Sequence, residues 1–130
     1  MAITEILPGI HYVGVNDRTT TRFEALWSLP MGVSYNAYLV AGEKIALIDT
    51  VEESFGSRLE ANISEAIGER KIDYLVVNHM EPDHAGSLAE VVARVKPEKI
   101  FVSTLGYKSM QGYFDCKDWP IEVVKSGDKL

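Results

Sequence analysis

The sequence predicts a single α/β domain with a mixed sheet, and three observations support this prediction. The chain has 130 residues and 46% hydrophobic content, which suits one globular domain. Its first part contains short β-like runs, and its later part alternates apolar runs with amphipathic helical patterns. Strands that alternate with helices favour parallel pairing through right-handed crossovers, with the helices on one face. We therefore expect a sheet that is antiparallel first and parallel afterwards.

The first expected elements are antiparallel strands. β-like runs cover residues 10–15 and 35–40, and KIALID at residues 44–49 predicts a further strand. Gly42 and Glu43 lie between the last two runs, and such a short glycine-containing link is typical of a hairpin turn.

The later elements alternate. Phe55, Leu59, Ile63 and Ile67 recur every four residues, which is the spacing of a helix that buries one stripe, and Gly68 marks its expected end. The remaining expected elements are a strand at 74–77, a helix from about 85 to 95, a strand at 100–102, a helix through 107–114 and a strand at 121–124. No composition break indicates a domain boundary.

Composition excludes several classes of function. The formal net charge of -6 and the pI near 5.0 argue against nucleic acid as a partner, because binding to a polyanion needs a basic face. Glu5 and Pro8 interrupt the pattern of a signal peptide, and no apolar run approaches the roughly 18 residues that span a bilayer. We expect a cytoplasmic protein without a membrane partner.

A single cysteine limits the metal chemistry. Cys116 has no partner for a disulfide or for an iron–sulfur or rubredoxin-like centre, and we interpret it as a small core residue. A metal would therefore have to be held by nitrogen and oxygen ligands.

The stretch VVNHMEPDHAG, residues 76–86, places four potential metal ligands within six residues: His79, Glu81, Asp83 and His84. It lies between an expected strand and an expected helix, where the sites of open α/β sheets collect. The competing interpretation is that Asp83 or Asn78 caps the following helix and that the histidines are surface residues.

The spacing of these residues suits two neighbouring metals. Pro82 disfavours the helical region for Glu81, so we expect the segment to stay extended until Asp83 and to place His79, Glu81 and Asp83 on one side. His84 joins them if the chain turns at the helix start, which would give His79 and Glu81 to one metal and Asp83 and His84 to the other. Two imidazoles and two carboxylates suit iron, manganese or zinc.

At this motif the chain resembles the metallo-β-lactamase superfamily, and within it the flavodiiron proteins. These carry H-x-E-x-D-H where the zinc hydrolases carry H-x-H-x-D-H, so Glu81 discriminates between them. The stretches RFEALWSLPMGVSYNAYLV, KIALIDT and VVNHMEPDHAGSL are similar to the amino-terminal half of a flavodiiron protein's diiron domain. The resemblance implies a four-layer αββα sandwich, of which residues 1–130 would be the first αβ half, without the flavodoxin domain.

The resemblance also implies the chemistry. Members of the family hold an oxo- or hydroxo-bridged pair of irons that reduces O2 to water, or NO to N2O, with electrons from FMN. By the matching positions, His79 and Glu81 would bind one iron and Asp83 the other. His84 would bind the second iron or lie just outside its ligand set, because relatives differ there.

Other residues matter less directly. Asp49, at the end of KIALID, matches an aspartate that supports the ligand loop, and a carboxylate beside metal-bound imidazoles is a common hydrogen-bond acceptor. Phe23, Glu24 and Trp27 match a segment that borders the metal pocket in relatives, although many of these have His at the position of Glu24. We interpret His11 as structural.

The chain lacks other parts of the family pattern. A family member supplies two further histidines and a bridging aspartate after this motif, whereas every histidine here precedes residue 85. We therefore expect a second polypeptide or a missing carboxyl half to complete the site, a flavin or rubredoxin-type electron donor, and an inactive isolated chain. Uncovered apolar sheet faces would also permit a homo-oligomer.

Two other functions remain open. The first is a two-metal hydrolase acting on an ester, thioester or phosphodiester, against which Glu81 argues. The second is a non-catalytic metal-binding or oxygen-sensing module.

Overall fold

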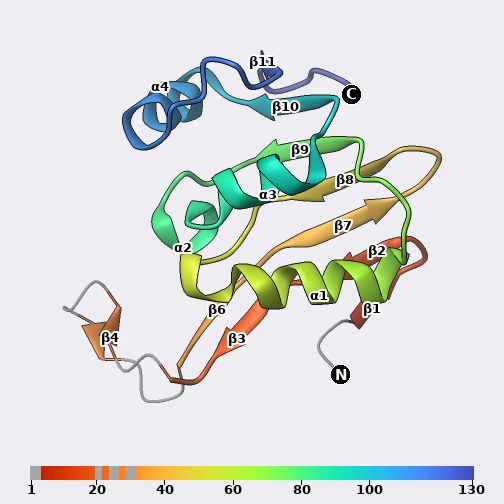
Figure 1. The fold of residues 1–130 in the computed structure, drawn as a ribbon, viewed down its shortest axis with the longest axis vertical. Coiled ribbons are helices and arrows are strands. Elements are labelled where there is room, and N and C mark those ends of the chain that lie inside the picture. Colours follow the sequence, from red (N-terminus) through yellow and green to blue (C-terminus); the bar gives the residue numbers. More distant parts are fainter. Residues whose placement is uncertain (1–3, 20–21, 24–26, 29–31) are drawn as a thin grey trace.

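The computed structural model describes residues 4–19, 22–23, 27–28 and 32–130, with side chains for 4–19 and 32–130. Its main element is a seven-stranded sheet with the order β1-β2-β7-β8-β9-β10-β11, seen in Figure 1 with α1 and α3 lying across one face. The expected α/β class with a mixed sheet is confirmed.

The first four strands of this sheet are antiparallel. They are β1 (Thr4–Leu7), β2 (Ile10–Tyr12), β7 (Tyr38–Ala41) and β8 (Ile45–Ile48). The expected hairpin joins β7 to β8, with Ala41 opposite Ile45, and the Gly42 N–H donates to the Lys44 carbonyl at 3.0 Å. β1 was not predicted.

The remaining strands continue in parallel, as predicted. β9 (Tyr74–Val77) pairs with β8, β10 (Lys99–Val102) with β9, and β11 (Ile121–Val123) with β10. The intervening helices are α1 (Gly56–Ile67), α3 (Leu88–Val95) and α4 (Thr104–Tyr113). Parallel strands bring their carboxyl ends to one edge of the sheet. The candidate ligands of residues 79–84 follow the carboxyl end of β9 at this edge.

Two strands that were predicted as continuous are each divided. Residues 10–15 form β2 and the start of β3 (Val15–Asp17), and residues 35–40 form the end of β6 (Val33–Tyr35) and most of β7. β3 pairs with β6 in a separate two-stranded sheet, and β4 (Arg22–Phe23) pairs with β5 (Trp27–Ser28). A Cβ on Gly14 would lie 2.2 Å from the Tyr35 carbonyl oxygen, so this close backbone approach, which only glycine permits, marks the break.

The helix predicted at 85–95 is also divided. The four-residue α2 (Pro82–Ala85) precedes α3, and a short 3₁₀ turn, η1 (Glu53–Phe55), precedes α1. Between α2 and α3, the Ser87 N–H donates to the Val51 carbonyl at 3.0 Å. Because this bond leaves the helical ladder, the chain changes direction there.

The core lies between the sheet and the helices. Alternate strand residues Leu39, Leu47, Leu75 and Ile100 are at most 1% exposed, and Leu59 of α1 is fully buried against them. Cys116 is also buried and free, which agrees with its interpretation as a core residue. Burial of this stripe supplies the main driving force for the fold.

The other sheet face is apolar but only partly covered. Strand alternation directs Tyr12, Tyr38, Tyr74 and Phe101 there, and two edge-on ring pairs form, with centroids 5.6 Å apart for Tyr12–Tyr38 and 5.3 Å apart for Tyr74–Phe101. Within the part of the chain that the structure describes, no helix has the length and hydropathy to cross a bilayer.

Candidate metal centre

The candidate ligands lie in one ten-residue stretch, residues 78–87, which we call the ligand segment. It begins where β9 ends at Val77 and finishes where α3 begins at Leu88. Its apolar residues Met80 and Ala85 are buried, at 8% and 3% exposure. The segment is therefore anchored through its apolar side chains, which leaves its polar side chains for a site.

Asp83 lies between two imidazoles. Its Oδ1 is 3.5 Å from Nε2 of His79, and its Oδ2 is 3.6 Å from Nε2 of His84. The two imidazole rings lie edge to face with centroids 5.2 Å apart. The structure therefore brings together three of the four residues that the sequence singled out.

The orientation of His84 is fixed by the backbone. Its Nδ1 lies 3.0 Å from the carbonyl oxygen of Asn36, in the turn between β6 and β7. Because a carbonyl only accepts hydrogen bonds, this contact places the ring proton on Nδ1. In the neutral ring Nε2 then carries the lone pair, and Nε2 is the atom that faces Asp83.

Glu81 lies apart from this group. Its side chain is exposed, and its carboxylate makes no hydrogen bond or ion pair with another described residue. Glu81 is extended at φ -73 and ψ 154, as Pro82 requires, but Pro82 already begins α2. The prediction that the segment stays extended to Asp83 is therefore wrong, because proline suits the first turn of a helix.

Helix capping does not account for these residues. The residue at the N-cap of α2 is Glu81 and that of α3 is Ser87, and neither makes a side-chain capping bond. The alternative interpretation of Asn78 or Asp83 as helix caps is therefore wrong.

Asp49 accepts hydrogen bonds from the start of the ligand segment. It follows β8 with a left-handed φ of 60°, and its Oδ1 accepts the N–H groups of Asn78 at 2.7 Å and His79 at 3.1 Å. Burial raises the pKa of Asp49, while these hydrogen bonds and the nearby imidazoles of His84 and His79 oppose the rise. Asp49 therefore orients the backbone at His79 from beneath.

The donor set fits a metal cation in part. Asp83 Oδ1 is buried and accepts no hydrogen bond from a described residue, and such an oxygen is costly unless a positive charge offsets it. Two imidazole nitrogens with carboxylate oxygens suit iron, manganese or zinc. Among the residues that the structure describes, however, no three His, Cys, Asp or Glu side chains already form a group able to hold an ion.

Glu24 lies outside the described residues, as do the side chains of Phe23 and Trp27. His11 lies on β2, where its Nε2 is 3.8 Å from a carboxylate oxygen of Glu5. This position agrees with its interpretation as structural.

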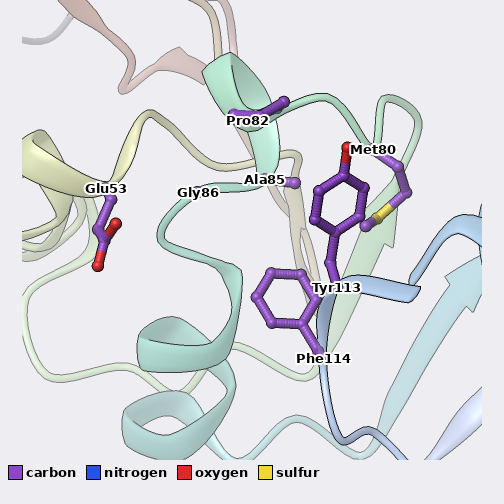
Figure 2. A pocket seen from close by; sticks show the side chains of 7 residues that line it. All are labelled: Glu53, Met80, Pro82, Ala85, Gly86, Tyr113 and Phe114. Atoms are coloured by element: carbon purple, nitrogen blue, oxygen red, sulfur yellow. The ribbon is translucent and has the colours of Figure 1, made fainter. Parts of the chain in front are cut away.

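A small pocket lies behind the ligand segment. It measures about 210 Å³, and Figure 2 shows Met80 with the rings of Tyr113 and Phe114 on one side and Glu53 on the other. Gly86 lines it and packs closely against the backbone of η1, because a Cβ there would be 2.6 Å from the Glu53 nitrogen. The end of α4 and η1 therefore support the segment from behind.

Comparison with known proteins decides the family. A family model described as ODP family beta lactamase matches residues 33–130. The chain belongs to this family. The matched range includes Asp49 and the complete ligand segment.

Individual relatives agree with the family model. Rubredoxin-oxygen oxidoreductase of Megalodesulfovibrio gigas is 46% identical over 100% of this chain and 32% of its own length. An anaerobic nitric oxide reductase flavorubredoxin homolog of Escherichia coli O157:H7 is 38% identical over 93% of this chain and 30% of its own length. The chain thus spans about a third of the curated relatives it matches.

A solved structure extends the agreement to three dimensions. The flavodiiron protein from Giardia intestinalis superposes with a TM-score of 0.91 at 25% identity, over 100% of this chain and 32% of its own. The resemblance to flavodiiron proteins, and the metallo-β-lactamase-like fold that it implied, are confirmed.

Sequence reasoning missed three groups that hold the ligand segment or His84 in place. Thr50 is fully buried and Ser87 is 2% exposed, and both bond to backbone atoms around the ligand segment. Only a weak indication of their role was present in the sequence. Thr50 is a small polar residue next to Asp49, and Ser87 is a small polar residue shortly after His84. The carbonyl of Asn36 had no signal, because backbone groups carry no residue identity.

Proposed function

We propose that this chain supplies part of the ligand set of a two-iron oxidoreductase centre that reduces dioxygen or nitric oxide. The observation that carries the proposal is Asp83, whose two carboxylate oxygens each face the Nε2 atom of a different imidazole. A largely buried carboxylate that faces two imidazole nitrogens offers oxygen and nitrogen donors of the kind that bind a cation.

The relatives support the choice of reaction. One is named a rubredoxin-oxygen oxidoreductase and another an anaerobic nitric oxide reductase flavorubredoxin homolog. Glu81 supports iron over zinc, because a larger carboxylate share favours harder, redox-capable metals. The choice between dioxygen and nitric oxide would depend on the residues that surround the open metal positions. We place most of those residues outside this chain.

We assign separate roles to the chain's own residues. His79 and Glu81 would bind one iron and Asp83 the other, with His84 at the second iron or beside it. Glu81 reaches such a position only if its exposed side chain turns toward His79. When bound, iron supplies the redox chemistry, and Asp49 holds the backbone of His79 in place.

The remaining ligands must come from elsewhere. We place residues 1–130 as the amino-terminal portion of a metallo-β-lactamase-like diiron domain, completed by a carboxyl half or a second polypeptide. That addition would also cover the aromatic sheet face around Tyr38 and Tyr74. Electrons would come from FMN in another domain or partner, or from a rubredoxin-type donor.

Iron content of the natural-length protein, purified without oxygen, tests this proposal. His79→Ala and Glu81→Ala should each lose most of the bound iron, because an open site has few ligands to spare. His11→Ala is the matched control, since it removes a histidine from β2 and should leave the iron content unchanged. Consumption of dioxygen and of nitric oxide with an added reductant should fall in parallel with the iron.

Two results would contradict the proposal. Unchanged iron content in both His79→Ala and Glu81→Ala would remove these residues from the ligand set. Zinc in place of iron, with turnover of an ester or phosphodiester, would instead identify a two-metal hydrolase.

A further inference from the structure

A strip of three consecutive residues, Asp49–Val51, lies beneath the ligand segment. Thr50 and Val51 are fully buried and Asp49 is 9% exposed. The strip follows β8 directly, and the Asp49 N–H still donates to the Val76 carbonyl of β9 at 2.9 Å. Its backbone is therefore fixed to the centre of the sheet.

The strip holds the far end of the ligand segment through two hydroxyl groups. Both the N–H and Oγ1 of Thr50 donate to the His84 carbonyl, at 3.0 and 2.8 Å. Ser87 Oγ donates to the Val51 carbonyl at 3.0 Å and accepts from the Val51 N–H at 3.3 Å. These bonds satisfy polar groups that would otherwise be buried without partners.

The same strip also holds the near end. Asp49 Oδ1 accepts the N–H groups of Asn78 and His79. The strip therefore bonds to the segment near both of its ends. Near the first end its partners are the backbone N–H groups of Asn78 and His79. Near the second end its partners are the His84 carbonyl and the Ser87 hydroxyl. The separation of the His79 and His84 imidazoles depends on this shared base.

Local structure alone cannot set that separation. α2 has only four residues, and a helix of one turn has almost no stability of its own. Its last carbonyls lack partners within the helix, and Thr50 provides two donors to one of them. The position of α2, with Asp83 and His84, is therefore decided by contacts outside it.

From this geometry we propose that Thr50 and Ser87 are positioning residues for the metal centre. Their hydroxyl groups fix α2 against the strip and so fix the distance of Asp83 and His84 from His79. The inference rests on the proposed metal centre and adds two residues that touch no metal themselves. Mutation of a group that orients metal ligands in this way typically weakens metal affinity by roughly 10- to 100-fold.

Thr50→Val tests this role because valine keeps the shape of threonine and removes only the hydroxyl donor. The natural-length protein is loaded with Mössbauer-active Fe2+ alone under anaerobic conditions, and iron loss to a chelator and the Mössbauer spectrum of the bound iron are recorded. We expect Thr50→Val and Ser87→Ala to lose iron roughly 10- to 100-fold faster with altered spectra. Thr50→Ser, which keeps the hydroxyl, should restore both properties.

A matched control separates positioning from general stability. Asp73 Oδ2 accepts the Ile45 N–H at 2.8 Å, at the opposite end of β8. Asp73→Ala should lower the unfolding midpoint and leave the iron spectrum and the rate of iron loss unchanged. Circular dichroism identifies any variant that does not fold, and Ser87→Ala then takes the place of Thr50→Val.

The outcomes distinguish two failures. Wild-type protein that takes up no Fe2+ overturns the proposed function and this inference with it. Wild-type protein that holds Fe2+, with folded Thr50→Val and Ser87→Ala variants of unchanged spectrum and retention, overturns the positioning role alone.

Discussion

Gly86 offers a sharp test of how the ligand segment is packed. Its backbone is right-handed helical, at φ -58 and ψ -35, so alanine would cause no conformational strain there. A Cβ at this position would, however, lie 2.6 Å from the Glu53 nitrogen, 2.8 Å from the Pro82 oxygen and 3.2 Å from the Glu52 carbonyl carbon. All three are backbone atoms, which cannot rotate away.

The expected cost of Gly86→Ala follows from these contacts. Overpacking of a tight site costs about 1–3 kcal/mol, and we expect about 2 kcal/mol because the backbone of two segments has to separate. At this chain length 1 kcal/mol corresponds to about 3–5 °C in Tm, so the loss is roughly 6–10 °C. The same displacement moves α2 with Asp83 and His84, so iron should also be retained less well.

Gly112→Ala is the matched control. Gly112 lies in α4, and nothing lies within 4 Å of a Cβ built there. Alanine should therefore stabilise this helix by about 0.5 kcal/mol. Both variants are compared by thermal and urea unfolding followed by circular dichroism. If Gly86→Ala unfolds at or above the wild-type temperature, the backbone contacts that we assign to Gly86 do not restrict the site.

The remaining predictions concern buried polar groups. Tyr12 Oη is buried without a hydrogen-bond partner among the described residues, so Tyr12→Phe should stabilise the protein by about 1 kcal/mol. Tyr35→Phe is the contrasting variant, because it removes a 2.9 Å hydrogen bond to Asp17 and should therefore cost about 2 kcal/mol. Burial raises the pKa of Tyr12, so the wild type should lose stability as the pH rises above about 10 and Tyr12→Phe should lack that part of the loss. Urea unfolding from neutral to alkaline pH measures both effects, and equal signs for the two variants would contradict them. Asp49→Ala should lower the free energy of unfolding by about 2–3 kcal/mol, because it leaves two N–H groups without their acceptor. Asp49→Asn should recover part of this loss. An Asp49→Ala variant with wild-type stability would refute the supporting role.

Some elements were predictable because their signal is local. The four-residue spacing from Phe55 to Ile67 and the stop at Gly68 predicted α1, and the short link at Gly42 predicted the β7–β8 hairpin. The clustering of ligand-type residues in VVNHMEPDHAG predicted where a site would lie. Such patterns depend only on how neighbouring residues share a face of a helix or strand.

Other features were not predictable because they depend on distant backbone. The break between β2 and β3 reflects the approach of Gly14 to Tyr35, and the break between α2 and α3 reflects the hydrogen bonds between Ser87 and Val51. No window of sequence contains both partners of these contacts. For the same reason Thr50 was not identified, although the neighbouring Asp49 was.

The sequence by itself determined the class of the fold, the parallel order of its later strands and the ligand types at residues 79–84. Those properties follow from side-chain periodicity and from the chemistry of individual residues. Only the tertiary structure decided that Asp83, and not Glu81, lies between the two imidazoles. It also decided that Asp49–Val51 holds both ends of the ligand segment. These arrangements depend on hydrogen bonds between segments that meet only when the sheet has formed.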